Sequence, residues 1–207
     1  MIPQGSDIAG LVHVLDDDEH VRIALARLLR AAGFEVRTHA SPASYLAEPA
    51  TVSPCCLVLD ERMPEVSGLE MQEALVREGS AVPIIFLTGH GDIPMSVRAM
   101  RAGAIDVLTK PVDRDLLLGA VTAAFARHAT AVSGQQQLDE VKGRYGKLTA
   151  REREVFEGVS AGKLNKQVAA DLDISERTVK AHRSQVMEKM QARSVADLVR
   201  AWELLQR

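Results

Sequence analysis

Four short apolar runs in this chain each end in polar residues, and this pattern limits the available folds more than any other feature. The runs cover residues 11–15, 55–59, 84–87 and 105–108, and amphipathic stretches separate them. Apolar runs that alternate with helical patterns are typical of a parallel sheet built from βαβ units. Because the carboxyl ends of parallel strands meet at one edge of a sheet, we expect the polar residues to form one pocket.

The residues that follow these runs are three carboxylates, a hydroxyl and an amine: Asp16, Asp17, Asp60, Thr88 and Lys110. Three carboxylates cannot crowd together fully ionised without a compensating cation, because each charge disfavours ionisation of its neighbours. Carboxylate oxygens are hard ligands, so the cation expected here is Mg²⁺. A hydroxyl and a lysine beside such a metal suit a phosphoryl group better than other ligands. The strand ends therefore predict a pocket that accepts a phosphoryl group.

The remainder of the first 128 residues completes an α/β pattern. A further strand is expected at 34–38, and helices are expected at 18–32, 41–48, 67–78, 92–102 and 112–128. Asp18 is expected to cap the first helix and Gly33 to end it. Ser41 before Pro42 marks the start of the second helix. Five strands alternating with five helices predict a doubly wound parallel sheet.

The pattern changes after residue 128. Residues 129–146 contain three consecutive glutamines and three glycines, and we interpret them as a linker whose first half continues the preceding helix. Beyond it the pattern is purely helical, with helices expected at 150–160, 165–172, 176–190 and 194–205 and start signals at Thr149, Asn165, Ser175 and Ser194. We therefore divide the chain into an α/β domain at 8–128, a linker at 129–146 and a helical domain at 147–207.

Charge is distributed unevenly between the two halves. The net charge of the whole chain is −3, but residues 147–207 hold 12 Lys and Arg against 9 Asp and Glu, which leaves this part at +3 and residues 1–146 at −6. A mildly basic module joined to an acidic body is a weak indication of nucleic acid binding.

The location of the protein is expected to be cytoplasmic. No apolar run approaches the roughly 20 residues that span a bilayer, and no secretory pattern opens the sequence, so no membrane partner is expected. Cys55 and Cys56 are adjacent in an expected buried strand. This arrangement fits apolar side chains in a reducing compartment better than a disulfide framework or a metal site.

Four sequence segments resemble the signatures of response-regulator receiver domains. They are Leu-Asp-Asp-Asp at 15–18, Leu-Asp-Glu-Arg-Met-Pro at 59–64, Leu-Thr-Gly-His-Gly-Asp at 87–92 and Thr-Lys-Pro at 109–111. Together with the helical half, they resemble the FixJ/NarL family of two-component transcription factors, and the stretch at 88–95 resembles its FixJ-like branch. The resemblance implies a CheY- and flavodoxin-like sheet with the strand order 2-1-3-4-5.

The resemblance also implies a role for each pocket residue. Asp60 would be the nucleophile that takes a phosphoryl group from a sensor histidine kinase. Mg²⁺ would be held by Asp16, Asp17, Asp60 and the backbone carbonyl of Arg62. Lys110 would contact a phosphoryl oxygen, and Thr88 would swing its hydroxyl onto the new group. The bond between Lys110 and Pro111 is expected to be cis, as in most receivers.

The second half resembles the LuxR-type helix-turn-helix. Its segments are Leu-Thr-Ala-Arg-Glu-Arg-Glu-Val at 148–155, Gly-Lys-Leu-Asn-Lys-Gln-Val-Ala at 162–169 and the stretch 174–182. Base edges in the major groove would be contacted by Lys180, Ala181 and Ser184, and phosphates by Lys166, Thr178 and Arg183. Glu152 is expected to accept a buried ion pair and Gly162 to end a helix. Without the motif, a solvated basic helix face would be the better interpretation.

Two residues depart from the receiver pattern. Val107 replaces an aromatic residue that rotates inward in many receivers, and valine has few rotamers and no ring to swing. Any signal is therefore expected to pass mainly through Thr88 and the loop to the helix at 92–102. Glu61 is acidic at a position where an apolar residue is expected, and it would lower local anion affinity or lie exposed on the rim.

The favoured interpretation is a phosphorylation-activated transcription factor that forms a homodimer and binds double-stranded promoter DNA, with RNA polymerase as a further candidate partner. Two alternatives remain. The chain is not expected to be an enzyme, because an aspartyl-phosphate phosphatase needs a second carboxylate shortly after Asp60 and position 62 is arginine. A DNA-binding protein independent of phosphorylation would be consistent with Val107 and Glu61.

Overall fold

The computed structural model describes residues 10–48, 54–64, 66–89 and 93–206 of the chain. The chain divides into two compact units, with the boundary after Val132. The expected domain start at residue 8, the first residue of the helix expected at 92–102 and positions 90–92 of the Thr-Gly-His-Gly-Asp segment lie outside the described residues.

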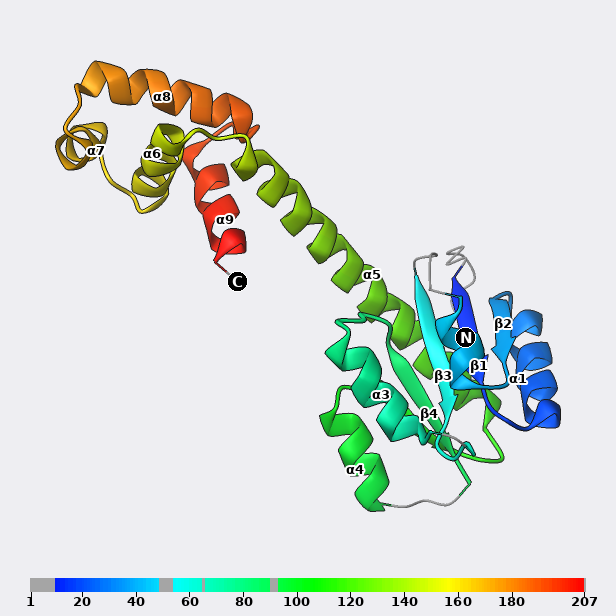
Figure 1. The fold of residues 1–207 in the computed structure, drawn as a ribbon. Coiled ribbons are helices and arrows are strands. Elements are labelled where there is room, and N and C mark those ends of the chain that lie inside the picture. Colours follow the sequence, from blue (N-terminus) through cyan, green and yellow to red (C-terminus); the bar gives the residue numbers. More distant parts are fainter. Residues whose placement is uncertain (1–9, 49–53, 65, 90–92, 207) are drawn as a thin grey trace. The chain divides into compact units, whose positions relative to one another are not determined.

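The first unit is a five-stranded parallel sheet with helices between the strands (Figure 1). The strands lie in the order β2-β1-β3-β4-β5, which confirms the predicted doubly wound fold. Their bounds are β1 Leu11–Leu15, β2 Glu35–His39, β3 Cys55–Asp60, β4 Ile84–Thr88 and β5 Asp106–Thr109. The helices are α1 Glu19–Ala31, α2 Pro42–Leu46, α3 Gly68–Arg77, α4 Ile93–Arg101 and α5 Arg114–Gly146.

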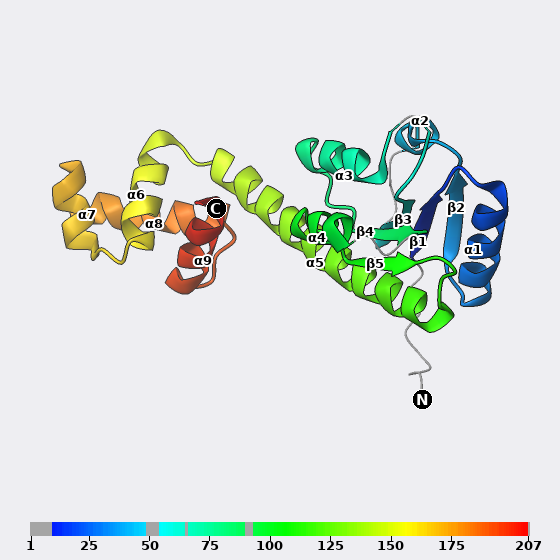
Figure 2. The ribbon, with the colours of Figure 1, turned by 90° about the horizontal axis from the view of Figure 1, so that it is seen from below.

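Helices cover both faces of the sheet (Figure 2). One core contains Leu25 and Leu29 of α1, Phe125 of α5 and alternate residues of the strands, such as Val12 and Val58. The other core packs strand residues such as Leu57 and Phe86 against the apolar residues of α2, α3 and α4: Tyr45, Met71, Leu75, Met95 and Ala99. Because β1, β3 and β4 are buried along their whole length, their near-continuous apolar runs are explained by cover on both faces.

Side-chain caps set most helix starts as predicted. Asp18 accepts hydrogen bonds from the backbone N–H groups of His20 and Val21, and Ser41 accepts one from Ser44. Asn165 is not a cap, contrary to our expectation, because it is the first residue inside its helix. Its side chain instead accepts a hydrogen bond from Arg183, and Gln167 accepts one from the N–H of Leu164.

The expected linker at 129–146 is helical throughout, because α5 continues without a break to Gly146. Our prediction of a helical first half therefore underestimated the helix, in which Gly134 and Gly143 are tolerated. By length and composition alone, α5 is long and apolar enough to cross a membrane. The apolar residues of its first half instead pack in the core of the sheet domain: Leu117, Ala120, Val121, Ala124 and Phe125.

The second unit is a helical domain around one core. Its helices are α6 Ala150–Ser160, α7 Asn165–Leu172, α8 Glu176–Lys189 and α9 Val195–Leu205, and the end of α5 packs on them through Val141 and Tyr145. Glu152 is buried and accepts hydrogen bonds from the Lys189 ammonium at 2.7 and 2.8 Å, as predicted. Gly162 follows the C-cap of α6 and has a φ of 82°, which explains why glycine is found at the end of this helix.

Two histidines are buried side by side beneath α2. Nδ1 of His13 on β1 and Nε2 of His39 on β2 are 3.0 Å apart, and the ring of Tyr45 lies edge-on to both. Burial, together with the neighbouring His39, lowers the pKa of His13 to about 4. Burial also lowers the pKa of His39. The folded domain therefore keeps His13 neutral under mildly acidic conditions.

We predict that His13 makes the first unit sensitive to acid. Between pH 6.5 and about 4 the unfolded chain takes up a proton at His13 that the folded chain does not. The free energy of unfolding should therefore fall over this window, by about 1.4 kcal/mol per pH unit. Urea unfolding at pH 7 and at pH 5 should show that the free energy of unfolding falls less in His13→Leu than in the wild type. His20→Gln, at an exposed position on α1, should keep the wild-type loss, and an equal loss in all three proteins would refute the prediction.

Candidate functional site

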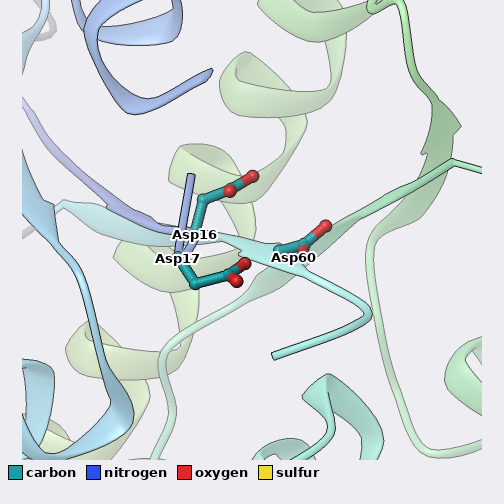
Figure 3. A group of neighbouring side chains, drawn as sticks. All are labelled: Asp16, Asp17 and Asp60. Carbon is teal, nitrogen blue, oxygen red and sulfur yellow. The ribbon is translucent and has the colours of Figure 1, made fainter. Parts of the chain in front are cut away.

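The register of the sheet brings the predicted pocket residues to one edge. Leu15 pairs with Leu59, so Asp16 directly after β1 and Asp60, the last residue of β3, lie at the same level of neighbouring strands. Asp60 pairs with Leu87 and Leu87 with Leu108, which places Thr88 and then Lys110 at the same edge. The side chains of Asp16, Asp17 and Asp60 converge there (Figure 3). One oxygen from each of these three carboxylates lies within 4.8 Å of the others.

Lys110 supplies a positive charge to this cluster of carboxylates. Its Nζ donates to Oδ2 of Asp16 and to Oδ1 of Asp60, each at 2.7 Å. The Asp16 side chain is only 1% exposed, whereas Asp17 lies at the surface. The peptide bond between Lys110 and Pro111 is cis, as expected from the resemblance.

Backbone contacts hold the acidic loop after β1 in place. The N–H of Asp18 donates to Oδ1 of Asp16 at 2.9 Å. The guanidinium of Arg22 donates to the backbone carbonyls of Asp16 and Asp17, each at 2.8 Å. Sequence reasoning missed Arg22, because an arginine in the first turns of a helix carries no signal that distinguishes it from a surface residue.

The two charged groups at the centre have shifted pKa values. Burial raises the pKa of Asp60, and the charges of Asp16 and Asp17 act in the same direction, while Lys110 partly offsets them. Burial alone would lower the pKa of Lys110, but its hydrogen bonds with Asp16 and Asp60 outweigh this and raise it. The lysine therefore remains charged, and ionisation of Asp60 lowers the stability of the folded state.

The donor set fits Mg²⁺. All three converging groups are carboxylates, which are the hard oxygen ligands that this ion prefers, and the cluster combines a buried Asp16 and Asp60 with an accessible Asp17. A nearby cation would also relieve the repulsion that raises the pKa of Asp60. Arg62 lies two residues after Asp60 in the loop from β3 to α3, and the role of its carbonyl as a ligand stays a prediction.

Thr88 is engaged by an acidic neighbour. Its hydroxyl donates to Oε2 of Glu61 at 2.6 Å, and the Glu61 side chain is only 12% exposed. Of the two sequence expectations for Glu61, the exposed position on the rim is therefore wrong. The only sign of this contact in the sequence was that an acid stood where an apolar residue was expected.

The second unit presents an exposed face of α8 that carries Lys180. Lys180, Ala181 and Ser184 are exposed on α8, while Val179 and Val186 on the opposite face are buried in the core. Exposed residues on one side of a helix, with the other side anchored, can enter a major groove.

The three residues expected to contact phosphates differ in their surroundings. Lys166 is exposed at the start of α7. Arg183 is half-buried, and its Nη1 donates to Oδ1 of Asn165 at 2.9 Å, so it also ties α8 to α7. Thr178 takes part in the cap of α8, with its Oγ1 2.8 Å from Oγ of Ser175.

We predict that Asp60→Asn stabilises the protein in the absence of metal. A raised pKa means that ionised Asp60 opposes folding at neutral pH, because the carboxylate is more easily ionised in the unfolded chain. A neutral amide of the same size removes this cost, so thermal unfolding in EDTA should show a Tm higher by a few degrees. Asp139→Asn, at an exposed position on α5, is the control and should leave Tm unchanged. A lower Tm for Asp60→Asn would contradict the prediction.

Both halves of the chain match known families. The response regulator receiver domain family matches residues 12–122, and the luxR family of bacterial regulatory proteins matches residues 146–202. The response regulator protein TodT of Pseudomonas putida is 46% identical over 200 residues, which cover 97% of this chain and 88% of TodT. The transcriptional regulatory protein FixJ of Rhizobium meliloti is 42% identical over 189 residues, which cover 91% of this chain and 93% of FixJ.

A solved structure agrees with this assignment. The low-resolution structure of the response regulator StyR is 43% identical and has a TM-score of 0.83, covering 94% of this chain and 98% of StyR. The chain therefore belongs to the family of two-component response regulators in which a receiver domain is joined to a LuxR-type DNA-binding domain, with FixJ and TodT among its relatives.

Proposed function

We propose that Asp60 accepts a phosphoryl group from a sensor histidine kinase and that this modification controls promoter binding. The observation that carries the proposal is the placement of Asp60 at the end of β3, with its carboxylate 2.7 Å from the Lys110 ammonium and beside two further carboxylates. A kinase phosphohistidine supplies a phosphoryl group on nitrogen, which a carboxylate oxygen of Asp60 attacks. The P–N bond breaks, a P–O bond forms, and the histidine leaves.

The surrounding residues support this transfer. Lys110 is positioned to neutralise charge on a phosphoryl oxygen, since its Nζ already contacts the accepting carboxylate. Asp16, Asp17, Asp60 and the carbonyl of Arg62 would hold Mg²⁺, which supplies charge neutralisation and orientation when bound. Transfer leaves the chain chemically unchanged apart from an acyl phosphate, so the protein acts as a switch rather than as an enzyme.

Thr88 would pass the change to the rest of the receiver. Its hydroxyl can leave Glu61 and donate to the phosphoryl group, which moves the end of β4. Val107 on β5 has no ring to rotate, so the movement would be carried by β4 and by the chain that leads from it to α4.

The surface of α4 supports dimer formation. Ile93, Val97 and Met100 are large, exposed apolar residues spaced along one face of α4, while Met95 and Ala99 pack inward. Arg98 and Arg101 on this helix and Asp106 on β5 are exposed as well. In a two-fold symmetric pair, such a face can bury its own apolar stripe and match its own positive and negative charges.

Dimerisation would place two α8 helices on two DNA half-sites. In this arrangement Lys180, Ala181 and Ser184 would read base edges, and Lys166, Thr178 and Arg183 would contact phosphates. The half-sites are expected about 34 Å apart, one turn of the double helix. Binding to promoter DNA would take place in the cytoplasm, where RNA polymerase is a candidate partner.

We predict that the phosphoryl analogue beryllofluoride, added with Mg²⁺, converts the protein from monomer to dimer. Sedimentation velocity should detect the shift in the wild type and no shift in Asp60→Asn, which lacks the accepting carboxylate. Val97→Asp should bind beryllofluoride yet remain monomeric, because a charge then lies in the apolar stripe.

The matched control is Ile23→Asp on α1. Ile23 and Val97 are equally exposed, at 42% and 43%, but α1 packs in the core opposite that of α4, so Ile23→Asp should dimerise like the wild type. If the wild type and Asp60→Asn dimerise identically, the proposal fails in favour of a DNA-binding protein independent of phosphorylation.

We predict that Lys180 and Lys166 contribute to DNA binding in different ways. On a duplex selected from a random-sequence pool by the beryllofluoride-treated wild type, Lys180→Ala should lose about 1–3 kcal/mol of binding free energy and discriminate less between selected and unselected duplexes. Lys166→Ala should weaken binding to both duplexes alike and reduce the salt slope by about 1. Equal loss of discrimination in the two variants would refute these assignments.

A further inference from the structure

Glu61 is held rigidly beside the phosphoacceptor. Its N–H donates to the carbonyl of Leu87 and its carbonyl accepts from the N–H of Gly68, each at 2.9 Å. Gly68 packs so closely that an added Cβ would lie 2.5 Å from the Asp60 carbonyl and 3.2 Å from Cα of Glu61. The backbone at Glu61 is therefore fixed from both the sheet and α3, which directs the side chain toward Thr88.

The Thr88 hydroxyl has one proton to donate. It donates this proton to Oε2 of Glu61 at 2.6 Å, a short bond to an acceptor that can carry charge. A phosphoryl oxygen on Asp60 would need the same proton. Glu61 and the phosphoryl group are therefore competing acceptors for one donor.

We propose that Glu61 is a positioning residue that keeps the Thr88 hydroxyl away from Asp60 and so opposes occupation of the pocket by a phosphoryl group. This inference rests on the proposed function, because it concerns the same pocket. It assigns a regulatory role to a residue outside the set proposed to hold the phosphoryl group and Mg²⁺. Arg62 offers the released carboxylate another partner, since its Nε lies 3.8 Å from Oε1 of Glu61 and its side chain is 69% exposed.

The test compares three residues at position 61 for beryllofluoride binding. In the full-length protein with Mg²⁺ at fixed pH, ¹⁹F NMR measures the fluoride bound at the pocket directly. Glu61→Leu removes the acceptor and should lower the beryllofluoride concentration for half occupancy about tenfold, the worth of a charge-assisted hydrogen bond. Glu61→Gln keeps a weaker acceptor, so its beryllofluoride concentration for half occupancy should lie between those of Glu61→Leu and the wild type.

Two further measurements separate a hydrogen bond from a general effect of charge. In a Thr88→Ala background there is no hydroxyl to hold, so Glu61→Leu should change half occupancy much less than it does with Thr88 present. Glu35→Gln removes the same charge at the start of β2, at the opposite end of the strands, and should bind as the wild type does. Thermal unfolding of each variant checks that the receiver remains folded.

Each outcome has one meaning. Tighter binding in Glu61→Leu that depends on Thr88 supports the proposal. Unchanged binding in Glu61→Leu, or equal gains with and without Thr88, overturns it while leaving the phosphoryl switch intact. Failure of the wild type and all position-61 variants to bind beryllofluoride would instead overturn the proposed function, and this inference with it.

Discussion

The contact of one ammonium group with two carboxylates holds the resting pocket together. Lys110 lies 2.7 Å from both Asp16 and Asp60, whose charges would otherwise face each other in a poorly solvated space. Lys110 follows β5, and β4 lies between β5 and β3, so only a long side chain reaches Asp60. The lysine is thus required by the strand order as well as by the charge. The same strand order brings the remaining pocket residues together, because each lies at the end of a strand, or just after it, along the same edge of the sheet.

The end of β4 connects the chemistry to the fold. Its Leu87 carbonyl accepts from the N–H of Glu61, and its Thr88 carbonyl accepts from the N–H of Lys110 at 2.7 Å. Thr88 is therefore tied through its backbone to the residue after β5 and through its hydroxyl to the residue after β3. In the proposed switch the hydroxyl leaves Glu61, but the backbone bond to Lys110 remains and would pass a shift of Thr88 to the end of β5. The proposed switch would use this bond to alter the α4 and β5 surface, since Val107 carries no rotating ring.

The sequence predicted the parallel sheet and the convergence of the acidic residues, because these depend on apolar periodicity and on the shared direction of parallel strands. The strand order was predicted from the resemblance to receiver domains. It could not predict Arg22, whose role depends on a side chain folding back over carbonyls five and six residues away. It also placed the cap of α7 at Asn165, since propensity favours asparagine there, whereas a tertiary bond to Arg183 uses that side chain. The continuous α5 was missed for a related reason: glycines and glutamines suggested a linker, but packing of Val141 and Tyr145 favours helix to Gly146.

A phosphoryl group can shift the receiver only by the difference between its contacts in the two states. In the resting state, two groups that would donate to the phosphoryl group are already bonded. Lys110 binds carboxylates, and the Thr88 hydroxyl donates to Glu61. In the proposed switch, the gain in free energy on phosphorylation is therefore the difference between these contacts and those made with the phosphoryl group, which is smaller than if both donors were unbonded at rest. An apolar residue at position 61 would remove this acceptor and widen that difference. In the proposed switch, the threshold is thus set by a residue beside the reacting group, without altering the group that reacts.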